Sequence, residues 1–169
     1  MPNHVYSEIR LHGVDLEKVK PLILKADGNI SFSVLCPLPL HFWPGSVGSQ
    51  HDEAFPGTHL DAARKTWGTK WDCYGEPDVM QDGIDVVISF QTAWDTPRGW
   101  TVALFNTLGC DITAEWLDEG RESSRRETYT TCPKWGPEWK QEILATISAD
   151  HRRLHKGLWG VEEFEPEAD

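Results

Sequence analysis

Apolar and polar residues alternate in several segments of the chain, as they do in half-buried β-strands. From Val5 to Leu11 every second residue falls on one face, and the longest alternation, in "IDVVISFQTAW", places Val86 and Trp94 on the same face. Strands are predicted at residues 4–13, 29–39, 69–74, 84–94, 111–120 and 127–131. The segments 69–74 and 84–94 are expected to form an antiparallel hairpin around the turn "QDG".

Helical spacing of apolar residues predicts four further elements. The first of them closes on Gly28, and Gly68 and Gly109 stand directly after the next two, where a helix commonly ends in a left-handed residue. Thr96 and Pro97 are a typical helix start, with a side-chain cap followed by a residue that needs no amide hydrogen. Helices are predicted at residues 14–28, 58–67, 97–108 and 136–154.

The order of these elements predicts an α+β protein with a ferredoxin-like α/β sandwich. We expect one mainly antiparallel sheet with helices on one face, an inserted loop and helix at about 40–68, and a C-terminal helix. Residues 1–160 would form a single domain, and the acidic tail 161–169 would be disordered. Trp71 and Trp94 are expected to fill the inner layer of the sheet against helix 97–108.

Charge is unevenly distributed along the chain. The formal net charge is -11, and residues 72–119 hold ten acidic residues against one basic residue, Arg98. A domain this acidic lacks the basic footprint that direct nucleic-acid binding normally needs. An acidic face can instead solubilise the protein or attract a basic protein partner.

The four cysteines indicate neither a disulfide framework nor a metal centre. Cys36, Cys73, Cys110 and Cys132 are far apart and contain no CxxC pair, so we expect four reduced thiols and no bound cofactor or metal. No segment approaches the roughly 18 apolar residues that cross a bilayer, and "MPNHVYSEIR" lacks the pattern of a secretory signal. These observations predict a cytoplasmic protein.

Two readings of the segment around "WGTKWDCYG" compete. In the first, its tryptophans pack the core. In the second, they form an exposed aromatic surface, bordered by the polar side chains at the outward-facing positions of the predicted strand 69–74. In the second reading the candidate binding residues also include acids of the segment 72–119. The full candidate set is Trp67, Lys70, Asp72, Tyr74, Asp95, Asp118 and Glu119.

An enzymatic alternative depends on histidines near carboxylates. His51, Asp52 and Glu53 are adjacent in a Gly-rich segment, and His151 and His155 are spaced so that one helix face could present both to a metal. A metal-dependent hydrolase or nuclease therefore stays an alternative. Single-stranded nucleic-acid binding by exposed tryptophans is a third possibility, which the charge opposes.

Four sequence landmarks together resemble the YubB-like family of phage and plasmid proteins. They are "MPNHV", "CPLP", "WGTKWD" and "FQTAWDTP", in this order, and the resemblance runs from Met1 to about Glu119. It implies a ferredoxin-like fold and carriage by a mobile genetic element in a bacterial host. It implies no catalytic mechanism.

Together these observations predict a non-catalytic accessory binding protein of a phage or plasmid. It would engage a host or mobile-element protein through an acidic, Trp-rich surface. Inhibition of host nucleic-acid-handling or defence machinery is a refinement of this hypothesis, motivated by the acids concentrated in residues 72–119.

Overall fold

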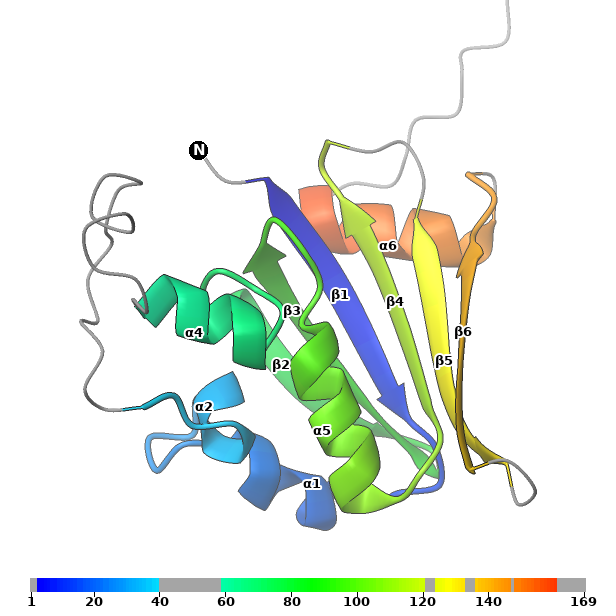
Figure 1. Cartoon of the computed structure of the whole chain (residues 1–169). Coiled ribbons are helices and arrows are strands. Elements are labelled where there is room, and N and C mark those ends of the chain that lie inside the picture. The colour runs from blue at the N-terminus through cyan, green and yellow to red at the C-terminus, as the bar shows by residue number, and fades with distance from the viewer. Residues whose placement is uncertain (1–2, 40–58, 121–123, 133–135, 147, 161–169) are drawn as a thin grey trace, which may run out of the picture.

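A six-stranded antiparallel sheet organises the described part of the chain (Figure 1). The computed structural model describes residues 3–39, 59–120, 124–132, 136–146 and 148–160. The strand order is β2-β3-β1-β4-β5-β6, so β1 is central and β2 and β6 are the edges. The strands are β1 (His4–Leu11), β2 (Tyr74–Asp82), β3 (Asp85–Ala93), β4 (Ile112–Asp118), β5 (Arg125–Cys132) and β6 (Gly136–Ile143).

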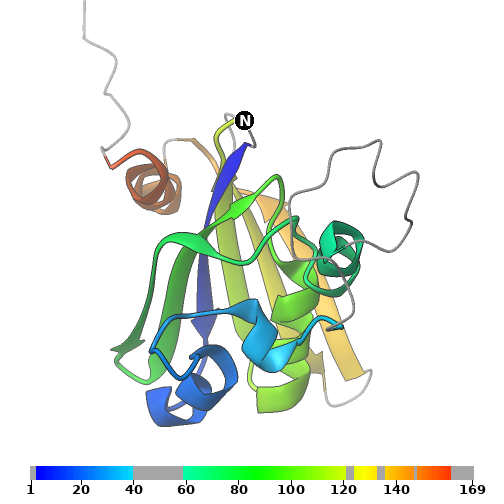
Figure 2. The same cartoon turned by 90° about the vertical axis from the view of Figure 1, so that its left-hand side faces the viewer.

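Helices cover both faces of this sheet, which corrects the prediction of a single covered face. In Figure 1, α5 lies in front of the strands and α6 behind them, and Figure 2 places α6 and α5 on opposite sides of β1. The helices of the described residues are α1 (Leu16–Ile23), α2 (Phe32–Leu35), α4 (His59–Thr66), α5 (Arg98–Leu108) and α6 (Ala149–Trp159). The result is an α+β architecture.

An aromatic cluster fills the larger core, between the sheet and helices α1, α2, α4 and α5. Phe32, Phe90 and Trp100 are fully buried, and the ring centroids of Phe32 and Trp100 are 4.8 Å apart. Trp67 meets Phe32 edge-on at 5.8 Å. Rings of this size remove large apolar areas from water, so this cluster anchors the helical layer to the sheet.

The smaller core lies under α6. Leu117 of β4 packs with Leu144, Leu154 and Leu158, and Tyr6 of β1 lies against them. Tyr6 and Leu117 are paired across β1 and β4, and they lie on the face of the sheet opposite Ile9 and Ala114, which belong to the larger core. Covering these positions with α6 explains why both phases of β4 are buried.

The alternation-based predictions succeed for the central strands. In β1, Val5, Ser7, Ile9 and Leu11 are buried. The predicted strands 84–94 and 111–120 contain β3 and β4, and the predicted strand 127–131 lies within β5. The hairpin is present, but its first strand is β2 and not residues 69–74.

Two strand predictions are wrong. Residues 29–39 contain the short helix α2, because Ser31 caps it and the Asp72 carboxylate accepts a 2.8 Å hydrogen bond from the amide of Phe32. Residues 69–73 form no strand, since the Asp72 side chain also accepts from the amide of Cys73 and holds the chain in a bend.

Three helix predictions also need correction. The helix expected at 136–154 begins only at Ala149, capped by Ser148, because residues 136–143 pair with β5 as β6. The first helix ends at Ile23 instead of continuing to residue 28. At α5, Pro97 occupies the cap position without a side-chain hydrogen bond, so Thr96 is not the cap, whereas the predicted stop at Gly109 is confirmed by its φ of 63°.

Trp94 does not fill the inner layer of the sheet. Its side chain is 50% exposed because β3 ends at Ala93 and the backbone of Trp94 turns to a φ of 74°. Trp71 is only partly buried. Trp67 and Trp100 supply the indoles of the core instead.

The edge strand β2 is irregular. Its pairing with β3 shifts register between Tyr74 and Asp78, Glu76 has a φ of 55°, and Pro77 lacks an amide hydrogen. Such bulges and prolines interrupt the row of free backbone groups at a sheet edge. The predicted insertion at about 40–68 lies partly outside the described residues, and its described part contains α4, which lies inside the predicted helix 58–67. The tail 161–169 lies wholly outside the described residues.

Gly157→Ala should destabilise the protein, although alanine normally favours a helix by about 1 kcal/mol over glycine. A Cβ atom at Gly157 would overlap the ring of Tyr6, which packs α6 onto the sheet. Urea unfolding should show a lower free energy of unfolding for Gly157→Ala. In the double variant Tyr6→Ala/Gly157→Ala the added methyl group should cost nothing; equal effects in both backgrounds would contradict the docking of α6 on Tyr6.

Candidate functional site

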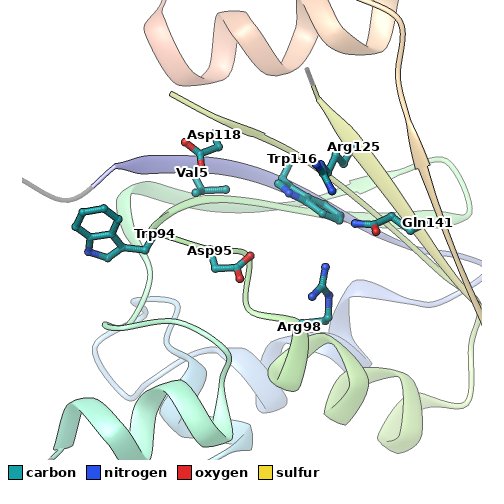
Figure 3. Close-up of a pocket in the computed structure, with 8 residues that line it drawn as sticks. All are labelled: Val5, Trp94, Asp95, Arg98, Trp116, Asp118, Arg125 and Gln141. Carbon is teal, nitrogen blue, oxygen red and sulfur yellow. The ribbon is translucent and has the colours of Figure 1, made fainter. Parts of the chain in front are cut away.

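A polar pocket of about 310 Å³ opens at the end of the sheet where β1 and β5 begin and β3 and β4 end. Figure 3 shows its side chains. They come from elements far apart in the sequence, which the antiparallel pairing brings to one edge. Its wall includes Trp94, Asp95 and Arg98 around the start of α5, Trp116 and Asp118 of β4, and Arg125 of β5.

Trp94 stands at this pocket in a costly backbone conformation. A left-handed backbone costs a residue other than glycine about 1–2 kcal/mol, and for a bulky side chain it is a clear outlier. The amide of Trp94 donates a 2.9 Å hydrogen bond to the carbonyl of Asn3, which holds the turn. The chain thereby presents a half-exposed indole at the pocket, and strain of this kind often accompanies function.

Arg98 forms one wall and neutralises a buried carboxylate. Its Nε donates a 2.8 Å hydrogen bond to Glu127, whose side chain is fully buried, and the Tyr129 hydroxyl donates to the other oxygen of Glu127 at 2.6 Å. The hydrogen bond to Glu127 raises the pKa of Arg98. Burial, followed by the hydrogen bond to Glu127, raises the pKa of Tyr129. Arg98 therefore stays cationic while it borders the pocket.

Arg125 faces the same pocket with an unused donor. Its Nε is buried, and it forms no hydrogen bond with any group in the described part of the chain. In Figure 3 the guanidinium lies beside the Trp116 indole, on the side opposite Arg98, whose guanidinium carbon is 5.9 Å from the Trp116 ring centroid. A buried donor without a partner is rare in folded proteins and calls for an explanation.

Two carboxylates complete the pocket. Asp95 is exposed and accepts a 2.8 Å hydrogen bond from the amide of Thr96. Asp118 accepts from the amide of Gly120 at 2.8 Å and from the side chain of Asn3 at 3.3 Å. In Figure 3, Trp94, Asp95 and Asp118 lie toward one end of the pocket and the arginines toward the other.

The structure divides the predicted binding residues into two groups. Asp95 and Asp118 line the pocket, and Lys70 borders an adjoining hollow of about 350 Å³ together with Trp94 and Asp95. Lys70 also lies over the Trp71 ring, 4.8 Å from its centroid. Four of the seven predicted residues line neither of these two hollows: Trp67, Asp72, Tyr74 and Glu119.

Trp67 and Asp72 have structural roles. Trp67 is buried, and its indole N–H donates a 2.7 Å hydrogen bond to the carbonyl of Cys36. Asp72 joins α2 to the chain before β2 through its bonds to Phe32 and Cys73. These contacts favour the reading in which this part of "WGTKWD" holds the fold together.

Tyr74 and Glu119 lie around the first residue of β1. The Tyr74 hydroxyl donates to the carbonyl of Thr92 at 2.8 Å and lies 2.9 Å from Nδ1 of His4. Burial, with a smaller effect of Glu119, raises the pKa of Tyr74 to about 12. The amide of Glu119 donates to the carbonyl of His4 at 2.9 Å. Tyr74 is therefore a neutral structural hydrogen-bond donor over the physiological pH range.

The predicted histidine pair is not a surface chelate. His151 is buried, and its Nδ1 lies 3.0 Å from the Ser124 hydroxyl, while the ring centroids of His151 and His155 are 6.4 Å apart. Across the described ranges of the chain, no group of three or more histidine, cysteine or carboxylate side chains is arranged to hold a metal ion. His51, Asp52 and Glu53 lie outside the described residues. The four cysteines are free and partly buried.

A second arrangement was missed by sequence reasoning. On the sheet face toward α6, Nε2 of His12 lies 2.8 Å from the Thr113 hydroxyl and Nδ1 of His12 lies 3.3 Å from the Asp85 carboxylate. The amide of Gly13, together with weaker effects of His12 and Arg10, lowers the pKa of Asp85. His12 and Thr113 line a hollow of about 540 Å³. A hydroxyl, an imidazole and a carboxylate in series are the components of nucleophilic catalysis.

Comparisons with protein-family models, curated protein sequences and solved structures give no significant match. No helix in the described part of the chain combines the length and the hydropathy needed to cross a membrane.

Trp94→Gly should be more stable than Trp94→Ala by about 1 kcal/mol, because glycine adopts a positive φ without steric cost. Both variants lose the same indole, so the comparison isolates the backbone. Chemical denaturation of the two proteins measures the difference. At a position with ordinary backbone geometry alanine would be the more stable variant, and that order would contradict the strained turn.

Proposed function

We propose that this protein is a non-catalytic binding protein that captures another protein at the end of the sheet where Trp94 and Asp95 stand. The observation that carries the proposal is the strained, half-exposed Trp94 beside the exposed Asp95. An indole held half-exposed in this way loses its contact with water when a partner covers it, and this burial supplies binding free energy.

A basic partner fits this surface best. Several acids of the segment 72–119 are committed to contacts within the chain: Asp72 to α2, Asp85 to Arg10, and Glu115 to Arg126. Asp95 and Asp118 line the same pocket as Trp94, and Glu119 follows Asp118 at a partly exposed position. Cations bind favourably both to carboxylates and over the face of an indole.

The proposal extends to the type of protein. The elements from β1 to β4 follow the order strand, helices, two strands, helix, strand, and their spatial order β4-β1-β3-β2 supports a ferredoxin-like unit to which β5, β6 and α6 are added. The resemblance to the YubB-like family supports an accessory factor of a phage or plasmid, acting in the cytoplasm of the bacterial host. Inhibition of host nucleic-acid-handling or defence machinery is the specific role that we propose for such a factor, and direct nucleic-acid binding is no part of it.

Replacing Asp95 and Glu119 by lysine should weaken capture of the partner about tenfold at low salt, which corresponds to about 1.4 kcal/mol. The immobilised protein would be incubated with bacterial lysate, and the retained proteins identified and titrated. Screening shortens electrostatic attraction to about 10 Å at 0.1 M salt, so the effect should shrink as salt rises.

The matched control is Asp78→Lys/Asp111→Lys, which changes the net charge equally at exposed positions, one in β2 and one directly before β4, at the end of that strand opposite the pocket. Equal loss in both double variants would mean that net charge, and not this surface, attracts the partner. Retention of the same proteins by Asp95→Lys/Glu119→Lys would overturn the proposal.

A hydrolase is the second candidate function, because of the series Thr113, His12 and Asp85. In the tautomer with the proton on Nδ1, His12 could accept the Thr113 proton while Asp85 holds the imidazole in place. The Thr113 oxygen would then attack an ester or amide carbonyl in the adjoining hollow, and the alcohol or amine would leave with the proton from His12. Water would then hydrolyse the acyl-threonine and restore the hydroxyl. This candidate uses residues other than the metal-binding histidines considered from the sequence.

Hydrolysis of p-nitrophenyl acetate tests the second candidate. The native protein should exceed free imidazole at the same pH, His12→Gln should lower the rate about a hundredfold, and Thr113→Val should do the same. Thr113→Ser keeps a hydroxyl and should retain activity. Equal rates for all four proteins would eliminate this function and leave the binding proposal intact.

A further inference from the structure

Arg125, whose buried Nε has no hydrogen-bond partner among the described residues, lines a pocket whose size suits a small group. A volume of about 310 Å³ is at the lower end of the range for ligand sites in proteins, about 300–1,000 Å³. Leaving a buried donor without a hydrogen bond costs about 1–3 kcal/mol, more for a charged group. The guanidinium of Arg125 is a cationic donor on the pocket wall, to which an anionic group that enters the pocket would be attracted.

The opposite end of the pocket favours a cation. Asp95 and Asp118 carry carboxylates there, and Trp94 lies at the same end with its ring turned away from them (Figure 3). The pocket therefore has an anion-accepting end, with Arg98 and Arg125, and a cation-accepting end. A ligand that matches both ends carries opposite charges separated by a few bonds.

A carboxylate fits the cationic end better than a phosphate. Arg98 is already bonded to the buried Glu127, so Arg125 is the guanidinium available for a ligand. A phosphate with nearly two negative charges would be repelled by Asp95 and Asp118 in the same pocket, whereas a carboxylate carries a single charge. A carboxylate also accepts the planar fork of an arginine in bidentate geometry.

We propose that this pocket binds a basic amino-acid residue with a free α-carboxylate, as at the C-terminus of a polypeptide that ends in lysine or arginine. The α-carboxylate accepts hydrogen bonds from Arg125, and the side-chain cation lies near the carboxylates of Asp95 and Asp118, at the end of the pocket that Trp94 borders. The inference rests on the proposed binding function and names the part of the partner that enters the pocket.

Isothermal titration with N-acetylated Gly-Gly-Lys tests this inference on the full-length protein. The peptide with a free C-terminus should bind at least about tenfold more tightly than its C-terminal amide, since a charge-assisted hydrogen bond contributes about 1.5–3 kcal/mol. Replacing the terminal lysine by glutamine should weaken binding by a similar factor. Equal affinity for acid and amide would overturn the inference.

Two variants assign the effects to the two ends of the pocket. Arg125→Gln should abolish the preference for the free carboxylate while keeping the preference for lysine over glutamine. Asp95→Asn should do the reverse. Arg152→Gln, which removes an exposed arginine of α6, is the matched control and should change neither preference. A lost carboxylate preference in Arg152→Gln would also refute the role of Arg125.

Free L-lysine distinguishes the two sources of this chemistry. Tighter binding of the peptide than of L-lysine assigns the pocket to a polypeptide C-terminus, and the converse assigns it to the free amino acid.

If Asp95→Lys/Glu119→Lys abolishes capture of a partner while acid and amide peptides bind equally, the proposed function stands and the C-terminal inference fails. If the peptide effects hold but the same double variant leaves partner capture unchanged, the pocket chemistry stands and the proposed capture surface fails.

Discussion

The contact between Arg98 and Glu127 connects the fold to its candidate site. Glu127 lies on β5 with a fully buried side chain, and an ionised carboxylate in such a position is tolerated only with a partner and several hydrogen bonds. Arg98, at the first turn of α5, and Tyr129, on the same strand, supply them. This requirement fixes the start of α5 against β5, and with it the connection after β3 that carries Trp94 and Asp95. Arg98, the one basic residue of the segment 72–119, therefore fixes the connection that carries Asp95 at the pocket.

The sheet adds a second constraint. Because side chains alternate between the two faces, β1 and β4 must satisfy two different layers at once. Ile9 and Ala114 face the aromatic core, while Tyr6, Glu8 and Glu115 face α6 and its arginines. One layer is dominated by rings and the other by a small leucine cluster with charge-assisted hydrogen bonds. The pocket lies where both layers end.

Sequence periodicity predicted the central strands, the stop at Gly109 and the α+β class, since these depend on interactions between near neighbours. It failed at residues 29–39, where Asp72, some forty positions later, caps a short helix around the buried Phe32. It failed again at 136–143, where pairing with β5 outweighs helical spacing. The polar phase of β1 looked solvent-exposed, so nothing local indicated a helix on that face. Among the pocket residues, Asp95 and Asp118 were predicted from the distribution of charge. Arg125 was not predicted, because its segment resembles a polar turn and its place in the pocket depends on the tertiary arrangement of β4, β5 and α5.

The irregular strand β2 has a consequence for how the molecule can associate. Its shifted register, Pro77 and the left-handed Glu76 deny an incoming strand a continuous set of hydrogen-bonding partners. The opposite boundary, β6, pairs with β5 over eight consecutive residues without a register shift. Addition of a strand from another polypeptide is thus favoured at the edge β6 and opposed at the edge β2. Copies of the protein that associate edge to edge through both β2 and β6 are therefore blocked by the irregular geometry of β2.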